Sequence, residues 1–238
     1  MFLTIDIGNT LTKALVFDEA RPMGDAIVVP SETTLIKDLI TSNRDKKIAL
    51  ATVITLHESV MEVIQQQQVL LVDGKTPLPI TSSYSTPQTL GVDRICAAVA
   101  ANSYFPTNAV LAIDMGTCIT YDIVSDIGEY LGGSISPGLR MRFRALSDFT
   151  SKLPHLEPLS TSSLIGKSTD EAMRIGVQQG ILTELQGTIG ALSTQFSNLK
   201  IVATGGDFPF FANDLKTPIF ADPFLVLRGL YEILRYNQ

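Results

Sequence analysis

The sequence predicts an α/β protein made of two similar lobes with a ligand cleft between them. Short apolar runs of strand length alternate with segments of helical periodicity along the whole chain. Hydrophobic residues make up 45 % of the 238 residues and charged residues only 18 %, which is sufficient material for a packed core. In addition, one segment near the N-terminus is repeated 108 residues later, which indicates an internal duplication.

The repeat aligns residues 3–16 with residues 111–124, and six of the fourteen aligned positions are identical. Both copies are typical of a strand, an Asp-x-Gly turn and a second strand. Chance similarity between two hairpins of an α/β protein is the alternative. The constant spacing favours a duplicated fold, with lobes at residues 1–108 and 109–238.

Turn residues separate the elements expected in the first lobe. The chain opens with a hairpin, because Gly8-Asn9-Thr10 interrupts two apolar runs. The expected strands are residues 3–7, 12–17, 26–29 and 47–53. The expected helices are residues 34–42, 57–68 and 91–103, and a polar, proline-containing stretch occupies residues 74–87.

The second lobe begins with an apolar strand that again ends at a glycine turn. The expected strands are residues 110–115, 120–124, 129–135 and 201–203. The expected helices are residues 138–149, 170–196 and 224–236, identified by the spacing of their apolar residues.

Composition argues against several classes of protein. A net charge of −6 predicts no binding to nucleic acid or to an anionic membrane surface, because phosphates would be repelled. The longest apolar runs fall short of the roughly 18–20 residues of a membrane span, and the acidic start lacks the basic region of a signal peptide. Two cysteines, Cys96 and Cys118, form no disulfide framework or zinc motif, so we expect buried, reduced thiols and a cytoplasmic location.

The two hairpins suit phosphate chemistry. An aspartate at a strand end can hold Mg²⁺, and a glycine turn lets backbone N–H groups approach phosphate oxygens. Thr10 or Thr117 can add a hydroxyl group, and Lys13 can add a positive charge. Two such hairpins facing each other would hold the phosphates of a nucleotide from both sides.

These hairpins carry a resemblance. Asp6-Ile-Gly-Asn-Thr10 and Asp114-Met-Gly-Thr117 resemble the two phosphate motifs of the superfamily of acetate and sugar kinases, heat-shock chaperones and actin. Thr204-Gly205-Gly206 resembles its adenosine motif. The resemblance implies duplicated ribonuclease H-like lobes of the actin-like ATPase fold, each a mixed sheet with flanking helices, and a nucleotide cleft between them.

Within that superfamily the chain is most similar to type III pantothenate kinase. The segment Thr86–Arg94 resembles its Pro-x-x-Leu-Gly-x-Asp-Arg signature, and Gly132–Gly138 resembles its Gly-Gly-x-Ile-x-Pro-Gly segment. Gly166–Thr169 resembles its second substrate segment. The motifs keep the family order over nearly the whole chain. Two positions depart from the pattern: Cys118 stands where alanine is usual, and Asp207 stands where a small residue is common.

The resemblance implies that a homodimer transfers a phosphoryl group from ATP to the primary hydroxyl of pantothenate, the first step towards coenzyme A. Asp93, at the expected start of a helix, would be the general base; an ordinary acid at a helix N-terminus is the alternative. Arg94 would either bind the pantothenate carboxylate or hold its loop through an ion pair.

The resemblance also assigns the binding residues. The expected ATP contacts are Asp6, Ile7, Gly8, Asn9, Thr10, Leu11, Thr12, Lys13 and Thr117. The expected pantothenate contacts are Tyr84, Gly91, Val92, Asp93, Arg94 and Thr169. Asp6 would hold Mg²⁺ with ATP, and Asp114 would bind a monovalent cation, K⁺ or NH₄⁺. Thr169 would act across a dimer interface. The alternatives are a surface tyrosine for Tyr84 and a helix N-cap for Thr169.

Two other patterns have plainer interpretations. Gly166-Lys-Ser-Thr169 imitates the end of a P-loop, but the earlier glycine and a preceding strand are missing. Arg140, Arg142 and Arg144 are more typical of a solvated helix face or an interface than of a ligand site. Two other functions remain open: an ATPase or phosphatase of the same superfamily that uses water as acceptor, and a non-catalytic regulator.

Overall fold

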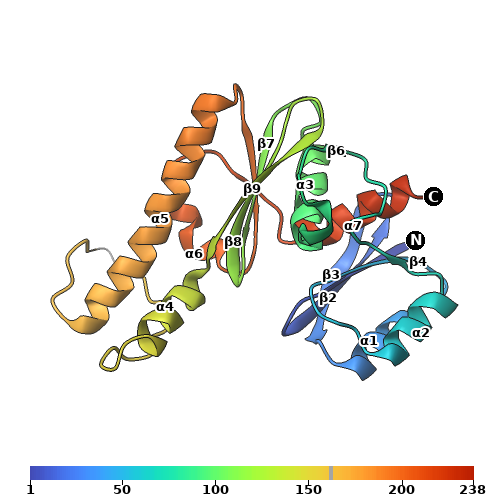
Figure 1. Cartoon of the computed structure of the whole chain (residues 1–238), viewed down its shortest axis with the longest axis horizontal. Helices are drawn as coiled ribbons and strands as arrows, with labels where there is room; N and C mark the ends of the chain where they lie inside the picture. Colours follow the sequence, from blue (N-terminus) through green and yellow to red (C-terminus); the bar gives the residue numbers. More distant parts are fainter. Residues whose placement is uncertain (161–162) are drawn as a thin grey trace.

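The computed structural model describes residues 1–160 and 163–238, and its two sheets with flanking helices confirm the predicted α/β class (Figure 1). Within these residues the strands form one five-stranded and one six-stranded sheet. The first sheet has the order β3-β2-β1-β4-β5. Its strands are β1 Phe2–Ile7, β2 Leu11–Asp18, β3 Arg21–Pro30, β4 Lys47–Thr52 and β5 Leu70–Leu71.

The second sheet has the order β11-β10-β7-β8-β9-β6. Its strands are β6 Thr81–Ser82, β7 Val110–Met115, β8 Cys118–Val124, β9 Glu129–Pro137, β10 Lys200–Thr204 and β11 Phe220–Ala221. Apart from β6 at its edge, this sheet repeats the order of the first. In each sheet the first strand of the repeat pairs antiparallel with its hairpin partner and parallel with the strand on its other side. The two sheets therefore share one strand order, as expected from the duplication that the sequence repeat predicts.

The register of the repeat needs one correction. Asp6 lies opposite Lys13 in the first hairpin, whereas Asp114 lies opposite Thr120 in the second. The second turn is one residue shorter, because β8 begins three residues after the end of β7 and β2 begins four residues after the end of β1. The offset of 108 therefore holds through the first strand only, and it becomes 107 where the second strands begin.

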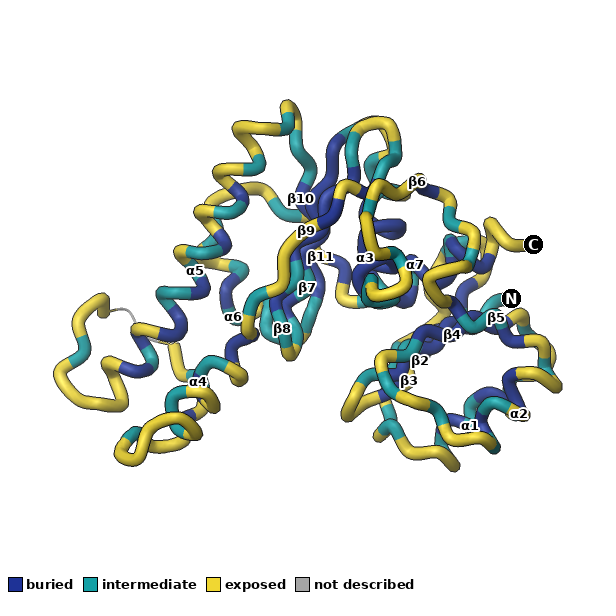
Figure 2. Tube along the Cα trace, in the orientation of Figure 1, coloured by how far each residue is buried: buried dark blue, intermediate teal, exposed yellow. Residues whose placement is uncertain are grey.

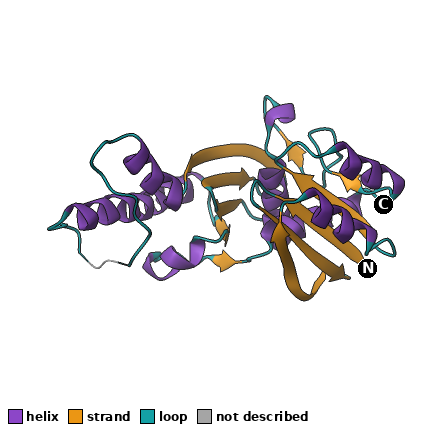
Figure 3. Cartoon of the chain, turned by 90° about the horizontal axis from the view of Figure 1, so that it is seen from below, coloured by secondary structure: helices purple, strands orange, loops and turns teal. Residues whose placement is uncertain are grey.

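The helices occupy three layers around the two sheets (Figures 1 and 3). The outer face of the first sheet packs against α1 Thr33–Thr41 and α2 Glu58–Gln66, and that of the second against α4 Leu139–Asp148 and α5 Thr169–Gln195. Between the sheets lie α3 Val92–Tyr104 and α7 Leu225–Tyr236. The boundaries of these six helices agree with the expected ones to within two residues. The short elements β5, β6, β11 and α6 Phe208–Phe211 were not expected, because so few residues show no periodicity.

Among the described residues, the largest cluster of buried hydrophobic side chains lies in the layer between the sheets (Figure 2). Helix α3 buries a run of small residues there, as predicted, including Cys96. Its contact with α7 is so close that a Cβ on Gly229 would lie 1.9 Å from the carbonyl oxygen of Cys96. Helix α7 packs on the first sheet and α3 mainly on the second. The division into lobes at residue 108 stays a prediction, since β6 pairs with the sheet of the other half.

In the described part of the chain, the helices are all too short or too polar to cross a membrane.

Candidate active site between the two lobes

Three aspartates and one lysine converge where the two hairpins meet helix α3. Burial and the charge of Asp93 raise the pKa of Asp6 to about 6, and Lys13 opposes this rise. Burial and the charge of Asp93 likewise raise the pKa of Asp114 to about 7, again against the influence of Lys13. Carboxylates that disfavour each other's ionisation must lie near one another. The fold thus brings together the acidic residues that the sequence places 108 residues apart.

The position of Asp93 is set by the start of α3. Gly91 occupies the N-cap, and Asp93 lies in the first turn, where backbone N–H groups favour an anion. The Oδ1 atom of Asp93 accepts a hydrogen bond from the backbone N–H of Arg94 at 2.9 Å. A Cβ on Gly91 would lie 2.5 Å from this oxygen, so a larger residue there would displace the carboxylate from this position.

Hydrogen bonds fix the base of the first turn, whereas its tip is exposed to solvent. The N–H of Gly8 donates to the carbonyl oxygen of Leu11 at 3.0 Å. Ser31 donates its hydroxyl to the carbonyl oxygen of Gly8 at 2.8 Å, and its Oγ lies 3.1 Å from the hydroxyl oxygen of Thr12. Residues 9–11 at the tip are exposed, whereas Thr12 is buried. Ser31 has no sequence signal as a site residue, because it lies in an ordinary loop after β3.

Two segments that contain glycine pack closely against the backbone of the second turn. Gly138 donates its N–H to the carbonyl oxygen of Thr117 at 3.0 Å, and a Cβ at Gly138 would lie 2.4 Å from the carbonyl oxygens of Gly116 and Thr117. Gly205 has a φ of +98°, and a Cβ there would lie 2.4 Å from the backbone of Met115. These contacts explain the glycines at positions 138 and 205, because no larger residue fits there against the second turn.

A cavity of about 680 Å³ opens between these segments. This volume lies within the range of small-molecule sites. Its walls come from both turns, from α4 and from the Gly-Gly segment: Thr10, Leu11, Met115, Gly116, Thr117, Arg140, Met141, Arg144, Gly206 and Asp207. Arg140 and Arg144 are exposed, as expected for a solvated face, and they also line this cavity. Arg142 turns away from it and pairs with Glu184 of α5.

A buried ion pair lies beside the acidic cluster. The Nη2 atom of Arg94 lies 2.7 Å from Oδ1 of Asp122, and both side chains are at least 93 % buried. Tyr130 donates its hydroxyl to the same oxygen at 2.7 Å, and the Tyr84 ring lies 5.9 Å from the Tyr130 ring. Of the two alternatives for Arg94, the structure contains the ion pair. Sequence reasoning missed Asp122, since it lies inside a strand without any motif. Tyr84 is half-buried over this cluster and packs on Gly132.

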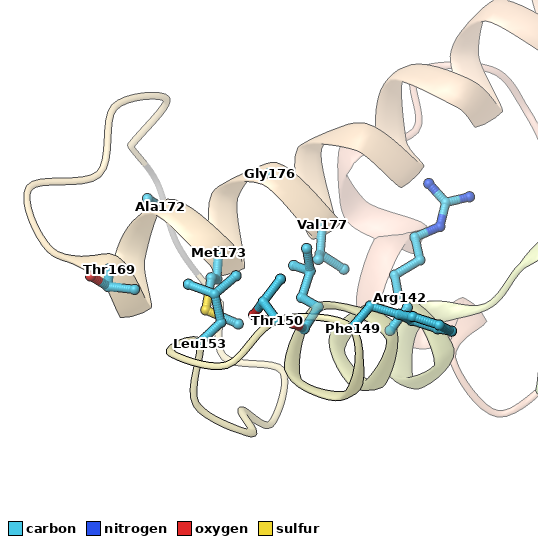
Figure 4. A pocket seen from close by; sticks show the side chains of 11 residues that line it. Arg142, Phe149, Thr150, Leu153, Thr169, Ala172, Met173, Gly176 and Val177 are labelled. Atoms are coloured by element: carbon cyan, nitrogen blue, oxygen red, sulfur yellow. Dashed lines mark hydrogen bonds between the residues drawn. The ribbon is translucent and has the colours of Figure 1, made fainter.

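Thr169 lies apart from the cluster within one chain. It is the first residue of α5, and Ser168 is the N-cap, with Oγ accepting from the N–H of Glu171 at 3.3 Å. The N-cap interpretation of Thr169 is therefore wrong. Thr169 lines an apolar groove of about 850 Å³ between α4 and α5, where Phe149 is 89 % exposed (Figure 4). This end of α5 is far from α3 (Figure 1).

The acidic cluster suits a cation that other oxygens help to bind. No three His, Cys, Asp or Glu side chains of residues 1–160 and 163–238 are arranged to hold a metal ion by themselves. Asp6 and Asp114 are nevertheless partly buried carboxylates whose pKa values desolvation and acidic neighbours raise, and a positive charge bound beside them would favour their ionised forms. A hard cation here would take its remaining ligands from phosphate or water.

An acidic strand end in each lobe, a shared cavity and a Gly-Gly turn against the second hairpin define a phosphoryl-transfer protein of the actin-like fold. Solved structures agree on the fold. A Baf family protein from Campylobacter jejuni matches with a TM-score of 0.63, 23 % identity and coverage of 99 % of this chain and 98 % of that one. A ROK family glucokinase from Streptomyces griseus, in complex with glucose and AMPPNP, matches with a TM-score of 0.55, 14 % identity and 99 % coverage of both chains.

Sequence comparison identifies the family. The family model of type III pantothenate kinase matches residues 2–191. A type III pantothenate kinase from Bacteroides fragilis is 43 % identical over 241 residues, covering 100 % of this chain and 99 % of the relative. The chain belongs to the type III pantothenate kinase family, as the sequence motifs indicate.

Proposed function

We propose that this chain phosphorylates pantothenate to 4′-phosphopantothenate with ATP as donor, in the first step of coenzyme A biosynthesis. Membership of the family supports this function. The observation that carries it is the meeting of Asp6, Asp93 and Asp114 beside a cavity that both lobes line. Phosphoryl transfer needs such a site, with a proton acceptor, bound cations and a held nucleotide.

Asp93 is the proposed general base. The N–H of Arg94 fixes its Oδ1, so Oδ2 is the oxygen that would take the proton of the pantothenate hydroxyl. The buried pair of Arg94 and Asp122 holds the start of α3 against β8 and so fixes the direction of the carboxylate. Gly91, Val92 and Arg94 would therefore shape the pantothenate site through the backbone of this turn.

ATP would lie with its phosphates between the two turns. Gly8 and the exposed tip Asn9-Thr10-Leu11 would approach from one side, and Thr117 from the other. Lys13 faces Asp6 across the hairpin and would neutralise phosphate charge. Ile7 and Thr12 are buried, so they would support the turn from beneath.

The raised pKa values suit the two proposed cations. Asp6 would hold Mg²⁺ together with ATP, and Asp114 would bind K⁺ or NH₄⁺. When bound, these ions neutralise charge on the phosphates. Each ion would also favour the ionised form of a carboxylate that burial and its acidic neighbours otherwise disfavour.

A homodimer would complete the pantothenate site. Thr169 lies too far from Asp93 to reach it within one chain, while it borders the apolar groove between α4 and α5. Phe149, which lines the groove, is 89 % exposed, and Leu164 and Ile165 in the segment before α5 are 75 % and 77 % exposed. Exposed apolar patches of this kind mark protein interfaces. A second copy seated on this groove would bring Thr169 of one chain towards the pantothenate site of the other.

A cytoplasmic location belongs to the same proposal, because both cysteines are free thiols.

The test is the release of ADP from ATP, measured with and without pantothenate while K⁺ and Mg²⁺ are varied. We expect release to require pantothenate and both cations. Hydrolysis that is independent of pantothenate would favour an ATPase or phosphatase. No turnover under any condition would favour a non-catalytic regulator.

A further inference from the structure

A polar network connects α5, β8 and β9 to α4, the helix that borders the proposed ATP cavity. Its centre is the ion pair between Arg142 of α4 and Glu184 of α5, whose side chains are only 20 % and 27 % exposed. Oε2 of Glu184 also accepts a hydrogen bond from the hydroxyl of Ser136 at 3.0 Å, and Oε1 accepts one from the hydroxyl of Tyr121 at 3.0 Å. Burial opposes the ionisation of Glu184, but the hydrogen bonds from Arg142, Ser136 and Tyr121 hold its pKa below the ordinary value. Glu184 is therefore ionised at neutral pH and keeps the guanidinium of Arg142 in one place.

Arg142 also holds the backbone at the end of β9. Its Nε donates a hydrogen bond to the carbonyl oxygen of Pro137 at 2.8 Å, and its Nη2 donates to Oγ of Ser136 at 2.7 Å. The guanidinium is planar and its donors have a fixed arrangement, so the contacts of Nη2 determine where Nε points. The network around Glu184 therefore fixes the position of the Pro137 carbonyl group.

The peptide unit that Arg142 holds is the one that contacts the second phosphate turn. The carbonyl group of Pro137 and the N–H of Gly138 belong to one planar peptide, and this N–H donates to the carbonyl oxygen of Thr117 at 3.0 Å. Because the unit is planar, the hydrogen bond from Arg142 on one side sets the direction of the hydrogen bond to Thr117 on the other. A rotation of this peptide would break the contact with Thr117 or displace the turn.

Arg142 has no direct access to the proposed ATP site. Arg140 and Arg144 of the same helix line the ATP cavity, whereas Arg142 points away from it towards α5. Arg142 borders instead the groove between α4 and α5, at the end away from Thr169 (Figure 4). An effect of Arg142 on ATP must therefore pass through the Pro137–Gly138 peptide.

We propose that Arg142 is a positioning residue for ATP binding, which holds Thr117 of the second turn in place through the Pro137–Gly138 peptide. This inference rests on the proposed function. Glu184 contributes to the same effect because it orients Arg142.

Calorimetry of ATP binding, with Mg²⁺ and K⁺ present, measures this effect without requiring turnover. We expect Arg142→Ala to bind ATP roughly tenfold more weakly than the wild type, because the second turn loses its fixed position. Arg44→Ala, which removes an exposed arginine that lines neither the ATP cavity nor the groove, is the matched control and should bind as the wild type does.

A double-mutant cycle separates positioning from a general loss of stability. Thr117→Ala should weaken ATP binding roughly tenfold in the wild-type background, as for the loss of a hydrogen bond to a charged group. In the Arg142→Ala background the same change should cost less than about twofold, because Thr117 is already displaced. Thr10→Ala, in the first turn, should weaken binding by the same factor in both backgrounds. A merely structural role of Arg142 would leave the effects of both threonines unchanged.

The second variant is Glu184→Gln, which keeps an oxygen that can accept from Arg142 but removes the charge. It should bind ATP several-fold more weakly than the wild type, and it takes the place of Arg142→Ala in the cycle if that chain does not fold. An Arg142→Ala chain that binds ATP as the wild type does would overturn the inference, as would a Thr117→Ala effect of equal size in both backgrounds. A wild-type chain that binds no ATP would overturn the proposed function itself, so the two failures are distinguishable.

Discussion

Replacing Asp114 by asparagine should stabilise the empty protein at alkaline pH. Burial and the neighbouring carboxylates raise the pKa of Asp114 from its ordinary value of 3.8 to about 7. The native state therefore keeps a proton that the unfolded state releases. This group contributes its full stability below about pH 4, and that contribution is lost as the pH rises through 7. The difference corresponds to about 4 kcal/mol at pH 8, since one pKa unit equals about 1.4 kcal/mol.

Thermal unfolding at pH 8 and pH 4, without nucleotide, K⁺ or NH₄⁺, measures this effect. Asparagine cannot ionise, so Asp114→Asn should unfold at least 5 °C above the wild type at pH 8, at roughly 2–4 °C per kcal/mol for a chain of this size. At pH 4 the two should unfold within a few degrees of each other. Asp126→Asn, which removes an exposed aspartate in the β8–β9 turn, is the matched control and should change neither value. An Asp114→Asn chain that is less stable than the wild type at pH 8 would refute the assignment of a destabilised buried carboxylate.

Three further predictions address the cation, the phosphate turn and the dimer. The K⁺ concentration that gives half-maximal ADP release should rise about fivefold between pH 7 and pH 6, because protonated Asp114 cannot bind a cation; an unchanged value would contradict the cation site. Gly138→Ala should weaken ATP binding at least tenfold in calorimetry, since its Cβ meets the carbonyl oxygens of the second turn, while Gly187→Ala, whose Cβ meets open space, should leave binding unchanged. In light scattering, Phe149→Asp should be a monomer, because it places a charge in the groove. Ile127→Asp changes a similarly exposed residue outside the groove and should stay a dimer. A monomeric wild type would contradict the homodimer.

Much of the fold was predictable because its signals are local. Helix α3 is a run of small apolar residues at helical spacing, and β7 is an apolar run that ends at a glycine, so both were expected within one or two residues. The duplication was predictable because a similar strand–turn–strand sequence occurs twice in the same chain, at residues 3–16 and 111–124. By contrast, β5 and β11 have two residues each, and tertiary pairing alone decides whether such a segment is a strand.

The candidate site was predictable where motifs mark it and unpredictable where the fold alone assembles it. Asp6 and Asp114 were found through their turns. Ser31 and Asp122, which hold the first turn and Arg94, lie in segments without a motif, and only the packing of β2 and α3 brings them into place. The paired role of Arg94 could not be chosen from sequence for the same reason, since its partner is 28 residues away in another element.

The transfer of labelled phosphate from [γ-³²P]ATP to pantothenate, by the wild type and by Asp93→Asn, tests the central claim most directly. The account predicts labelled phosphopantothenate from the wild type and a rate lower by roughly 10²–10⁴-fold for Asp93→Asn, as for the loss of a general base. Nucleotide binding and the unfolding temperature of the variant should stay close to those of the wild type. An Asp93→Asn chain that transfers phosphate at the wild-type rate would contradict the account.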